Sequence, residues 1–208
     1  QLEESEAEHG TVVVMETRTG EIKASSNLGR TKAGKYYERL NYAVGESHEP
    51  GSTFKLMTMV AALEDKVIDS SYVIDTENGR VKFYDRVVKD SKWGGYGKIS
   101  AAKAFELSSN TAFAKMIDEH YRDNPRKFID RLINMGLGET LGVTIKGEGK
   151  PKIPYPGDKD WYGTTLPWMA HGYGVALTPL QTLAFYNAIA NDGEMVKPRF
   201  LREVREFD

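Results

Sequence analysis

The stretch "EPGSTFKLMTMVAALE", residues 49–64, places a serine three residues before a lysine at the start of a strongly apolar segment. From Phe54 to Leu63 almost no residue is polar, which is the pattern of a helix buried on all sides. Residues i and i+3 share a helix face, so the amine of Lys55 can reach the hydroxyl of Ser52. The stretch therefore predicts a central helix, and it offers a candidate nucleophile with a candidate base.

A second Ser-x-x-Lys, at Ser100 and Lys103, shows how little the spacing alone decides. That serine opens a modestly amphipathic helix, so we interpret the pair as a helix cap beside a solvated lysine. Ser52 and Lys55 allow the same interpretation, with the lysine stem lying along apolar surface. The apolar helix behind Lys55 gives the catalytic interpretation equal weight with the structural one, because burial lowers a lysine pKa from its usual value of about 10.4.

The tripeptide Ser-Ser-Asn occurs at residues 25–27 and again at 108–110. The first copy ends a predicted strand and enters a glycine-containing loop, so turn formation explains it. The second separates two predicted helices, where its side chains can cap both ends. A catalytic lysine also needs one group that relays a proton and one that holds the amine, and Ser108 and Asn110 have suitable side chains. Both interpretations of the second copy stay open.

The composition excludes several classes of partner and chemistry. The chain has 208 residues, of which 40% are hydrophobic, and a net charge of −2 without a long basic run. Such a chain can bury a core, and neither nucleic acid nor an anionic membrane surface is its expected partner. The absence of cysteine excludes disulfides, thiol nucleophiles and cysteine-bound zinc. No two of the four histidines have i,i+4 spacing, so the sequence predicts no metal site and no cofactor.

The remaining predicted elements follow in chain order. They are an acidic linker over 1–9, a hairpin over 11–25, a loop over 27–50, helices over 100–107 and 111–121, a third helical pattern (Phe128, Leu132, Ile133) ending at Gly136, an irregular stretch over 142–170, and the start of a strand over 198–208. The apolar runs are far shorter than the roughly 18 residues of a membrane span.

The clearest helix signals follow Thr178. Thr178 is the predicted N-cap, Pro179 occupies the first helical position, Gln181 completes a capping box, and Gly193 ends the helix. The predicted apolar stripe consists of Leu180, Leu183, Ala184 and Ile189.

Together, "EPGSTFKLMTMVAALE", "SSNTAFAKM" and "GYGVALTPLQTLAFYNAIANDGEMVKP" resemble the transpeptidase domain of the class B penicillin-binding proteins, in the order in which that family has them. The resemblance extends from His9 to the end of the chain. It implies a mixed α and β protein of the β-lactamase/transpeptidase-like fold, with an antiparallel sheet flanked by helices and an all-helical lobe. The implied lobes are 10–66 with 172–208 for the sheet, and 67–171 for the helices and cleft loops.

The resemblance also implies a role for each matching residue. Ser52 would attack the D-Ala-D-Ala carbonyl of a peptidoglycan stem peptide to form an acyl-enzyme, and Lys55 would take its proton. Ser108 would relay the proton to the leaving group, and Asn110 would hold Lys55 and the substrate amide. An amine of a second stem peptide would complete the cross-link, whereas β-lactams would trap Ser52.

The family's third motif, Lys-Thr-Gly or Lys-Ser-Gly, does not follow residue 110. The nearest match, Arg18-Thr19-Gly20, lies in the first predicted turn. We therefore expect the third motif and its strands beyond Asp208, so that the chain is a partial transpeptidase domain that is weakly acylated or inactive.

The wording of the first motif and "LPWM" resemble the septal, division-type members. This resemblance implies the periplasmic face of the inner membrane, an anchor outside this chain, and a membrane glycan polymerase and division proteins as partners. Two alternatives stay open. One is a class D-like β-lactamase or β-lactam sensor, a group that this chain resembles less at the second motif, where such proteins have valine at the position of Asn110. The other is a non-catalytic pseudo-transpeptidase scaffold.

Overall fold

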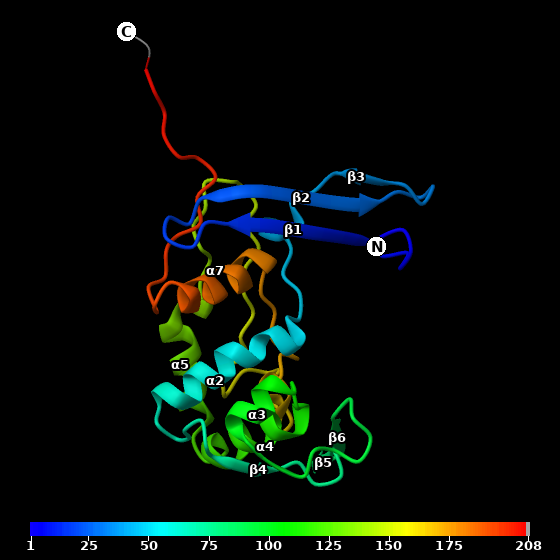
Figure 1. The fold of residues 1–208 in the computed structure, drawn as a ribbon, viewed down its shortest axis with the longest axis vertical. Helices are drawn as coiled ribbons and strands as arrows, with labels where there is room; N and C mark the ends of the chain where they lie inside the picture. Colours follow the sequence, from blue (N-terminus) through cyan, green and yellow to red (C-terminus); the bar gives the residue numbers. More distant parts are fainter. Residues whose placement is uncertain (207–208) are drawn as a thin grey trace. The chain divides into compact units, whose positions relative to one another are not determined.

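The computed structural model describes residues 1–206, whose contacts group them into two compact units (Figure 1). The sheet unit comprises Gln1–His48, Glu139–Pro151 and the chain from Leu177 onward. The helical unit comprises Glu49–Gly138 and Lys152–Ala176. Both the predicted nucleophile helix and the second Ser-Ser-Asn belong to the helical unit.

The sheet unit is built on an antiparallel sheet in the order β1-β2-β3. Its strands are β1 (His9–Met15), β2 (Ile22–Arg30) and β3 (Tyr36–Glu38). The predicted hairpin is confirmed: Val12 pairs with Ser26, and a bulge between Val14 and Met15 shifts the register near the turn. Val12 and Val14 are exposed while their neighbours in β1 are half-buried, so only one face of this strand packs on the unit.

Helix α7 (Pro179–Ala190) packs against β1 within this unit (Figure 1). Its predicted capping box is present: the Thr178 hydroxyl accepts from the Gln181 N–H at 3.1 Å, and Gln181 Oε1 accepts from the Thr178 N–H at 2.8 Å. The predicted stripe was partly wrong, because Ile189 is 45% exposed. The buried face also takes in two polar side chains; its members are Leu180, Gln181, Ala184, Phe185, Asn187 and Ala188.

Several segments of the sheet unit are more ordered than predicted. Residues 1–9, predicted as a linker, turn back onto the sheet because the Tyr36 hydroxyl donates to the carbonyls of Leu2 and Ala7 at 2.7 and 2.5 Å. The predicted loop over 27–50 was wrong: it contains the end of β2, β3 and helix α1 (Tyr42–Gly45). Asn27 explains the last of these, since its Oδ1 accepts from the Ala43 N–H at 3.0 Å.

The predicted final strand does not form within the described residues. A bridge joins Arg199 to Glu21, and 201–206 have no regular structure. The last two residues of that prediction, 207–208, lie outside the described part of the chain.

The helical unit contains the 3-10 turn η1 (Gly51–Phe54), α2 (Lys55–Glu64), α3 (Ala101–Glu106), α4 (Asn110–Tyr121), α5 (Pro125–Leu132), the π turn η2 (Ile133–Leu137) and α6 (Thr165–Met169). Two short antiparallel pairs accompany them: β4 (Val73–Asp75) with β7 (Lys98–Ser100), and β5 (Arg80–Phe83) with β6 (Arg86–Lys89). The irregular segment predicted over 142–170 therefore contains one helix, α6, and residues 73–100 contain four strands.

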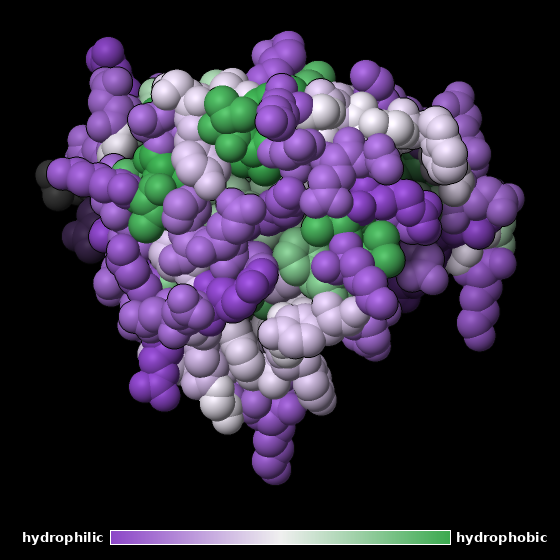
Figure 2. All heavy atoms as spheres, turned by 90° about the horizontal axis from the view of Figure 1, so that it is seen from below, coloured by the Kyte–Doolittle hydropathy of each residue, from purple (hydrophilic) through white to green (hydrophobic). Residues whose placement is uncertain are grey.

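The predicted central helix is present, and Phe54, Met57 and Ala61 are completely buried, but the helix is not buried on all sides because Leu63 is 39% exposed. Helix α2 contacts α3, α4 and α5, and these contacts assign it to the helical unit instead of the sheet lobe predicted over 10–66. Residues 139–151 belong to the sheet unit, since the Glu139 carbonyl accepts from Gln181 Nε2 at 2.9 Å. The face shown in Figure 2 is mostly hydrophilic with small apolar patches, as expected of a surface in water. No helix within residues 1–206 is long and apolar enough to cross a membrane.

Replacing Thr178 by alanine tests the α7 cap. Thr178→Ala should lower the free energy of unfolding by about 1 kcal/mol, because it removes the acceptor for a buried N–H at the helix start. Urea denaturation measures the change. Thr182→Ala is the matched control, since Thr182 is in the interior of the same helix and not at its cap. Equal losses in the two variants would contradict this role of the cap.

Candidate active site

A single buried amine joins all four residues predicted from the sequence. Lys55, the first residue of α2, is 1% exposed, and its Nζ lies 3.1 Å from Ser52 Oγ. The same nitrogen donates to Ser108 Oγ at 2.9 Å, to the Ser108 carbonyl at 2.6 Å and to Asn110 Oδ1 at 2.6 Å. The hydroxyl-bearing residues Ser52 and Ser108 are exposed. A bound molecule can therefore reach both hydroxyls while the amine between them stays out of water.

These contacts suit an amine that can accept a proton. A lysine ammonium has three N–H donors, and here four oxygens surround Nζ. A neutral amine has two N–H groups and one lone pair, so it can hold Ser108 and Asn110 while the Ser52 hydroxyl donates to it. The geometry thus fits both protonation states of Lys55, as a general base requires.

The surroundings lower the pKa of Lys55. Burial lowers it from 10.5 to about 8, and the negative charge of Asp90 opposes this change. With a pKa of about 8, about one amine in ten is neutral at pH 7, compared with about three in ten thousand for an unperturbed lysine. The burial of Lys55 is therefore the physical source of this fraction of neutral amine.

In the second Ser-Ser-Asn, one residue caps helix α4 and the other two contact Lys55. Ser109 is the N-cap of α4, and its hydroxyl accepts from the Ala112 N–H at 3.1 Å. Ser108 has a φ of 53°, an uncommon backbone conformation for a residue with a side chain. Asn110 donates through Nδ2 to the Lys89 carbonyl at 3.0 Å, which leaves Oδ1 toward Lys55. Both interpretations of this tripeptide therefore hold, for different residues: Ser109 caps the helix, and Ser108 and Asn110 contact Lys55.

Asp90 holds this tripeptide in place, and sequence reasoning missed it. Its carboxylate accepts from the Ser109 hydroxyl at 3.0 Å, from the Thr111 N–H at 3.0 Å and from the Thr111 hydroxyl at 2.6 Å. Asp90 follows β6 in a stretch rich in charge and glycine, "VVKDSKWGG", which is typical of a turn. No signal in the sequence links it to residues 109–111.

Close contacts between two backbone segments fix the turn that contains Ser52. The Gly51 N–H donates to the Gly172 carbonyl at 3.0 Å, and Glu49 Oε1 accepts from the Gly174 N–H at 2.8 Å. Gly172 has a φ of 90°, and a Cβ there would lie 1.9 Å from the Gly51 carbonyl oxygen. Only glycine fits at residue 172, so the "HGYG" segment holds the turn that contains Ser52.

His171 is a second buried ionisable group that sequence reasoning did not place at the site. It is 5% exposed, and neither ring nitrogen has a hydrogen-bond partner within the described residues. Burial, followed by the positive charge of Lys55, lowers its pKa from 6.5 to about 4. His171 is therefore neutral at pH 7 and adds no positive charge beside the lysine.

A cavity of about 600 Å³ adjoins the segments that hold Ser52. Its lining includes Glu49 and Gly174 from those segments, the rings of Trp168 and Tyr173, and the cation Arg86. Aromatic faces with a few charged groups suit an extended, partly polar ligand such as a peptide.

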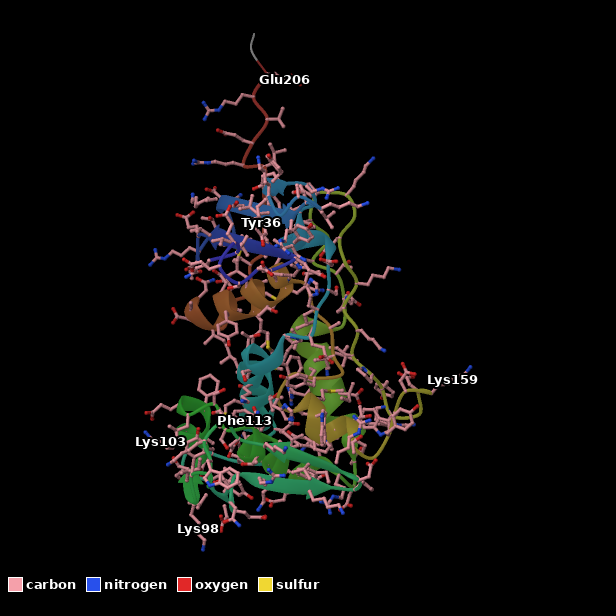
Figure 3. All side chains as sticks on the ribbon, turned by 90° about the vertical axis from the view of Figure 1, so that its right-hand side faces the viewer. Tyr36, Lys98, Lys103, Phe113, Lys159 and Glu206 are labelled. Carbon is pink, nitrogen blue, oxygen red and sulfur yellow. The ribbon has the colours of Figure 1, made fainter. Side chains whose placement is uncertain are left out.

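The competing motifs are structural. Ser100 caps α3 by accepting from the Lys103 N–H at 3.1 Å, and Lys103 pairs with Glu106 at 2.6 Å. Figure 3 shows Lys103 at the edge of the helical unit and Phe113 in its interior. The first Ser-Ser-Asn, predicted as a turn, is part of β2 instead, because all three of its residues pair with β1.

The family model for the penicillin-binding protein transpeptidase domain matches residues 10–206. The chain belongs to this family. Its curated relatives include penicillin-binding protein PbpB of Mycolicibacterium smegmatis, 30% identical over 95% of this chain and 31% of the relative. Peptidoglycan D,D-transpeptidase FtsI of Escherichia coli is 26% identical over 91% of this chain and 32% of the relative. The chain thus spans about a third of the length of these relatives.

Solved structures support the fold of this transpeptidase domain. The apo transpeptidase domain of penicillin-binding protein 3 from Burkholderia pseudomallei has a TM-score of 0.80 and 24% identity, over 98% of this chain and 56% of that chain. A structure described as a peptidoglycan glycosyltransferase from Burkholderia ambifaria has a TM-score of 0.81 and 24% identity, over 100% of this chain and 61% of that chain. The predicted class B family and the predicted β-lactamase/transpeptidase fold are both confirmed.

Replacing Asp90 tests how the second motif is held. Asp90→Ala should lower the free energy of unfolding by about 2 kcal/mol, because it leaves the buried donors of Ser109 and Thr111 without an acceptor. Chemical denaturation measures this loss. Asp85→Ala is the control, because that carboxylate is exposed and precedes β6. If Asp90→Ala were no less stable than the control, Asp90 would not be the support of the motif.

Proposed function

We propose that this domain acts as a serine D,D-transpeptidase that cross-links peptidoglycan stem peptides through an acyl-enzyme on Ser52. The observation that supports it most is the Lys55 amine, which is buried, has a lowered pKa and lies within hydrogen-bond distance of Ser52, Ser108 and Asn110. Escherichia coli FtsI, a relative, is named a peptidoglycan D,D-transpeptidase.

In the proposed first step, neutral Lys55 takes the proton of the Ser52 hydroxyl while Oγ attacks the carbonyl of the D-Ala-D-Ala bond. The tetrahedral intermediate then expels the terminal D-Ala amine. Ser108 donates its proton to that amine and is reprotonated by the Lys55 ammonium, 2.9 Å away. These transfers leave Ser52 acylated and return Lys55 to its neutral form.

In the second step, the amine of another stem peptide attacks the Ser52 ester. Ser108 and Lys55 take the proton of that amine, and Ser52 Oγ leaves and regains its own proton. Asn110 keeps the Lys55 amine oriented through both steps by its 2.6 Å contact. A β-lactam would acylate Ser52 in the same way, but its opened ring keeps the leaving nitrogen attached.

We further propose a place for this domain in the cell envelope, on the outer face of the inner membrane, in a division complex with a membrane glycan polymerase. Support comes from two relatives, peptidoglycan D,D-transpeptidase FtsI of Escherichia coli and stage V sporulation protein D of Bacillus subtilis, the latter 28% identical over 92% of this chain and 30% of the relative.

Acylation of Ser52 by a fluorescent penicillin tests the proposal. In the full-length gene product, we expect covalent labelling that Ser52→Ala abolishes and Lys55→Ala lowers at least a thousandfold. Ser100→Ala and Lys103→Ala are matched controls with the same motif spacing, and both should label normally. Peptide mass spectrometry locates the adduct. Labelling that survives in Ser52→Ala would overturn the assignment of the nucleophile.

The 208-residue chain alone should label slowly, because it has no Lys-Thr-Gly or Lys-Ser-Gly after Asn110 to supply the family's third motif. Strong labelling of this chain would contradict that expectation. Rapid turnover of a chromogenic cephalosporin, in place of a slow stoichiometric burst, would contradict the transpeptidase assignment and favour a β-lactamase.

The rate of acylation should rise with pH. Because neutral Lys55 is the base and its pKa is about 8, the rate constant should increase about tenfold from pH 6 to pH 7 and level off above pH 9. Stopped-flow acylation of the full-length gene product measures the profile. A rate constant that does not change between pH 6 and pH 9 would rule out Lys55 as the titrating base.

A further inference from the structure

The sheet unit brings together three side chains that the proposed transpeptidase chemistry does not use. His9 begins β1, Glu46 follows α1, and His48 lies two residues further along. One ligand-type atom of each lies within 4.8 Å of the other two. His9 and His48 are too far apart in sequence for any local metal motif, which is why the sequence predicted no metal site.

The distances between these atoms are those expected of ligands around one metal ion. Glu46 Oε2 is 3.4 Å from His9 Nε2 and 3.2 Å from His48 Nε2. Bonds of about 2.0–2.1 Å at tetrahedral angles place the ligand atoms of a zinc ion about 3.3 Å apart. Glu46 Oε2 is buried and has no hydrogen-bond partner among residues 1–206. A buried carboxylate oxygen thus faces two imidazole nitrogens.

The surrounding residues hold the three side chains in these positions. The ring of Tyr42 stacks on that of His9, with centroids 4.2 Å apart and planes 8° from parallel. The backbone of His48 pairs with that of Leu177 through two hydrogen bonds of 3.0 Å. Glu46 is the C-cap residue of α1, a helix that Asn27 fixes to the sheet. Each ligand is thus fixed by a different contact of the sheet unit.

We propose that His9, Glu46 and His48 form a binding site for a divalent transition-metal ion, with Zn²⁺ as the expected ion. Two imidazoles and one carboxylate are a ligand set that zinc accepts, with the fourth position left to water or another donor. His48 is exposed and His9 is half-buried, so the ion can enter from solvent. The bound ion would join β1, the end of α1 and the segment paired with Leu177, and so stabilise the sheet unit.

Calorimetric titration of the untagged, chelator-treated full-length gene product with zinc chloride tests the proposal. We expect one site that His9→Ala, His48→Ala and the nearly isosteric Glu46→Gln each weaken at least tenfold. His120→Ala is the matched control, because that histidine lies on α4 of the helical unit and should leave binding unchanged. At zinc concentrations about 100 times Kd, the Tm of the wild type should rise by about 5–10 °C, and the Tm of the His48→Ala variant should rise less.

Cobalt substitution gives an independent readout that does not depend on activity or on stability. Co²⁺ at a tetrahedral histidine and carboxylate site absorbs visible light, and this absorption should appear in the wild type and in His120→Ala but not in His48→Ala. Absence of a zinc site in the wild type, or binding unchanged by all three ligand substitutions, would overturn the proposal and leave the cluster as ion pairs alone. Circular dichroism of each variant separates lost binding from lost folding.

Discussion

The burial of one amine is the constraint on which the rest of the site depends. A lysine Nζ without contact to water must find oxygen partners from the protein, since an unpaired buried charge is costly. Here Ser52, Ser108 and Asn110 supply them. The same burial that makes these contacts necessary lowers the pKa of Lys55, so the contacts and the lowered pKa have one cause.

The partners of the Lys55 amine come from two segments of the chain, and different contacts fix each segment. Asp90 binds the hydroxyls and the N–H around Ser109 and thereby sets Ser108 and Asn110. The close approach of Gly51 to Gly172 sets the turn with Ser52. His171, which lies next to these segments, is neutral at pH 7 and so adds no second positive charge near Lys55. The site is thus preorganised by contacts between segments far apart in the sequence.

The sequence predicted what depends on local patterns. The hairpin, the buried helix α2, the break between α3 and α4 and the capping box at Thr178 all follow from periodicity or side-chain chemistry within a few residues. The four site residues could be named because the resemblance covers their motifs, and the geometry then brought them together. By contrast, the role of Asp90 depends on a partner about twenty residues away, with no local signature.

The other features that the sequence did not predict also have physical causes. Ile189 belongs to an apolar stripe by spacing, but the packed face of α7 includes Gln181 and Asn187, which find hydrogen-bond partners inside the sheet unit. The strands β4 to β7 are only three or four residues long, too short for alternation to be recognised. The cluster of His9, Glu46 and His48 forms only when β1 and α1 pack together.

The pKa of Lys55 is the most direct test of whether burial activates this amine. Heteronuclear NMR of the protein with labelled lysine side chains measures it, and Lys55→Arg identifies the resonance. We expect a midpoint near 8 for this amine, well below the 10.5 of an unperturbed lysine. A midpoint near 10.5 would show that burial does not activate Lys55, and the account of a lysine base acting on Ser52 would be wrong.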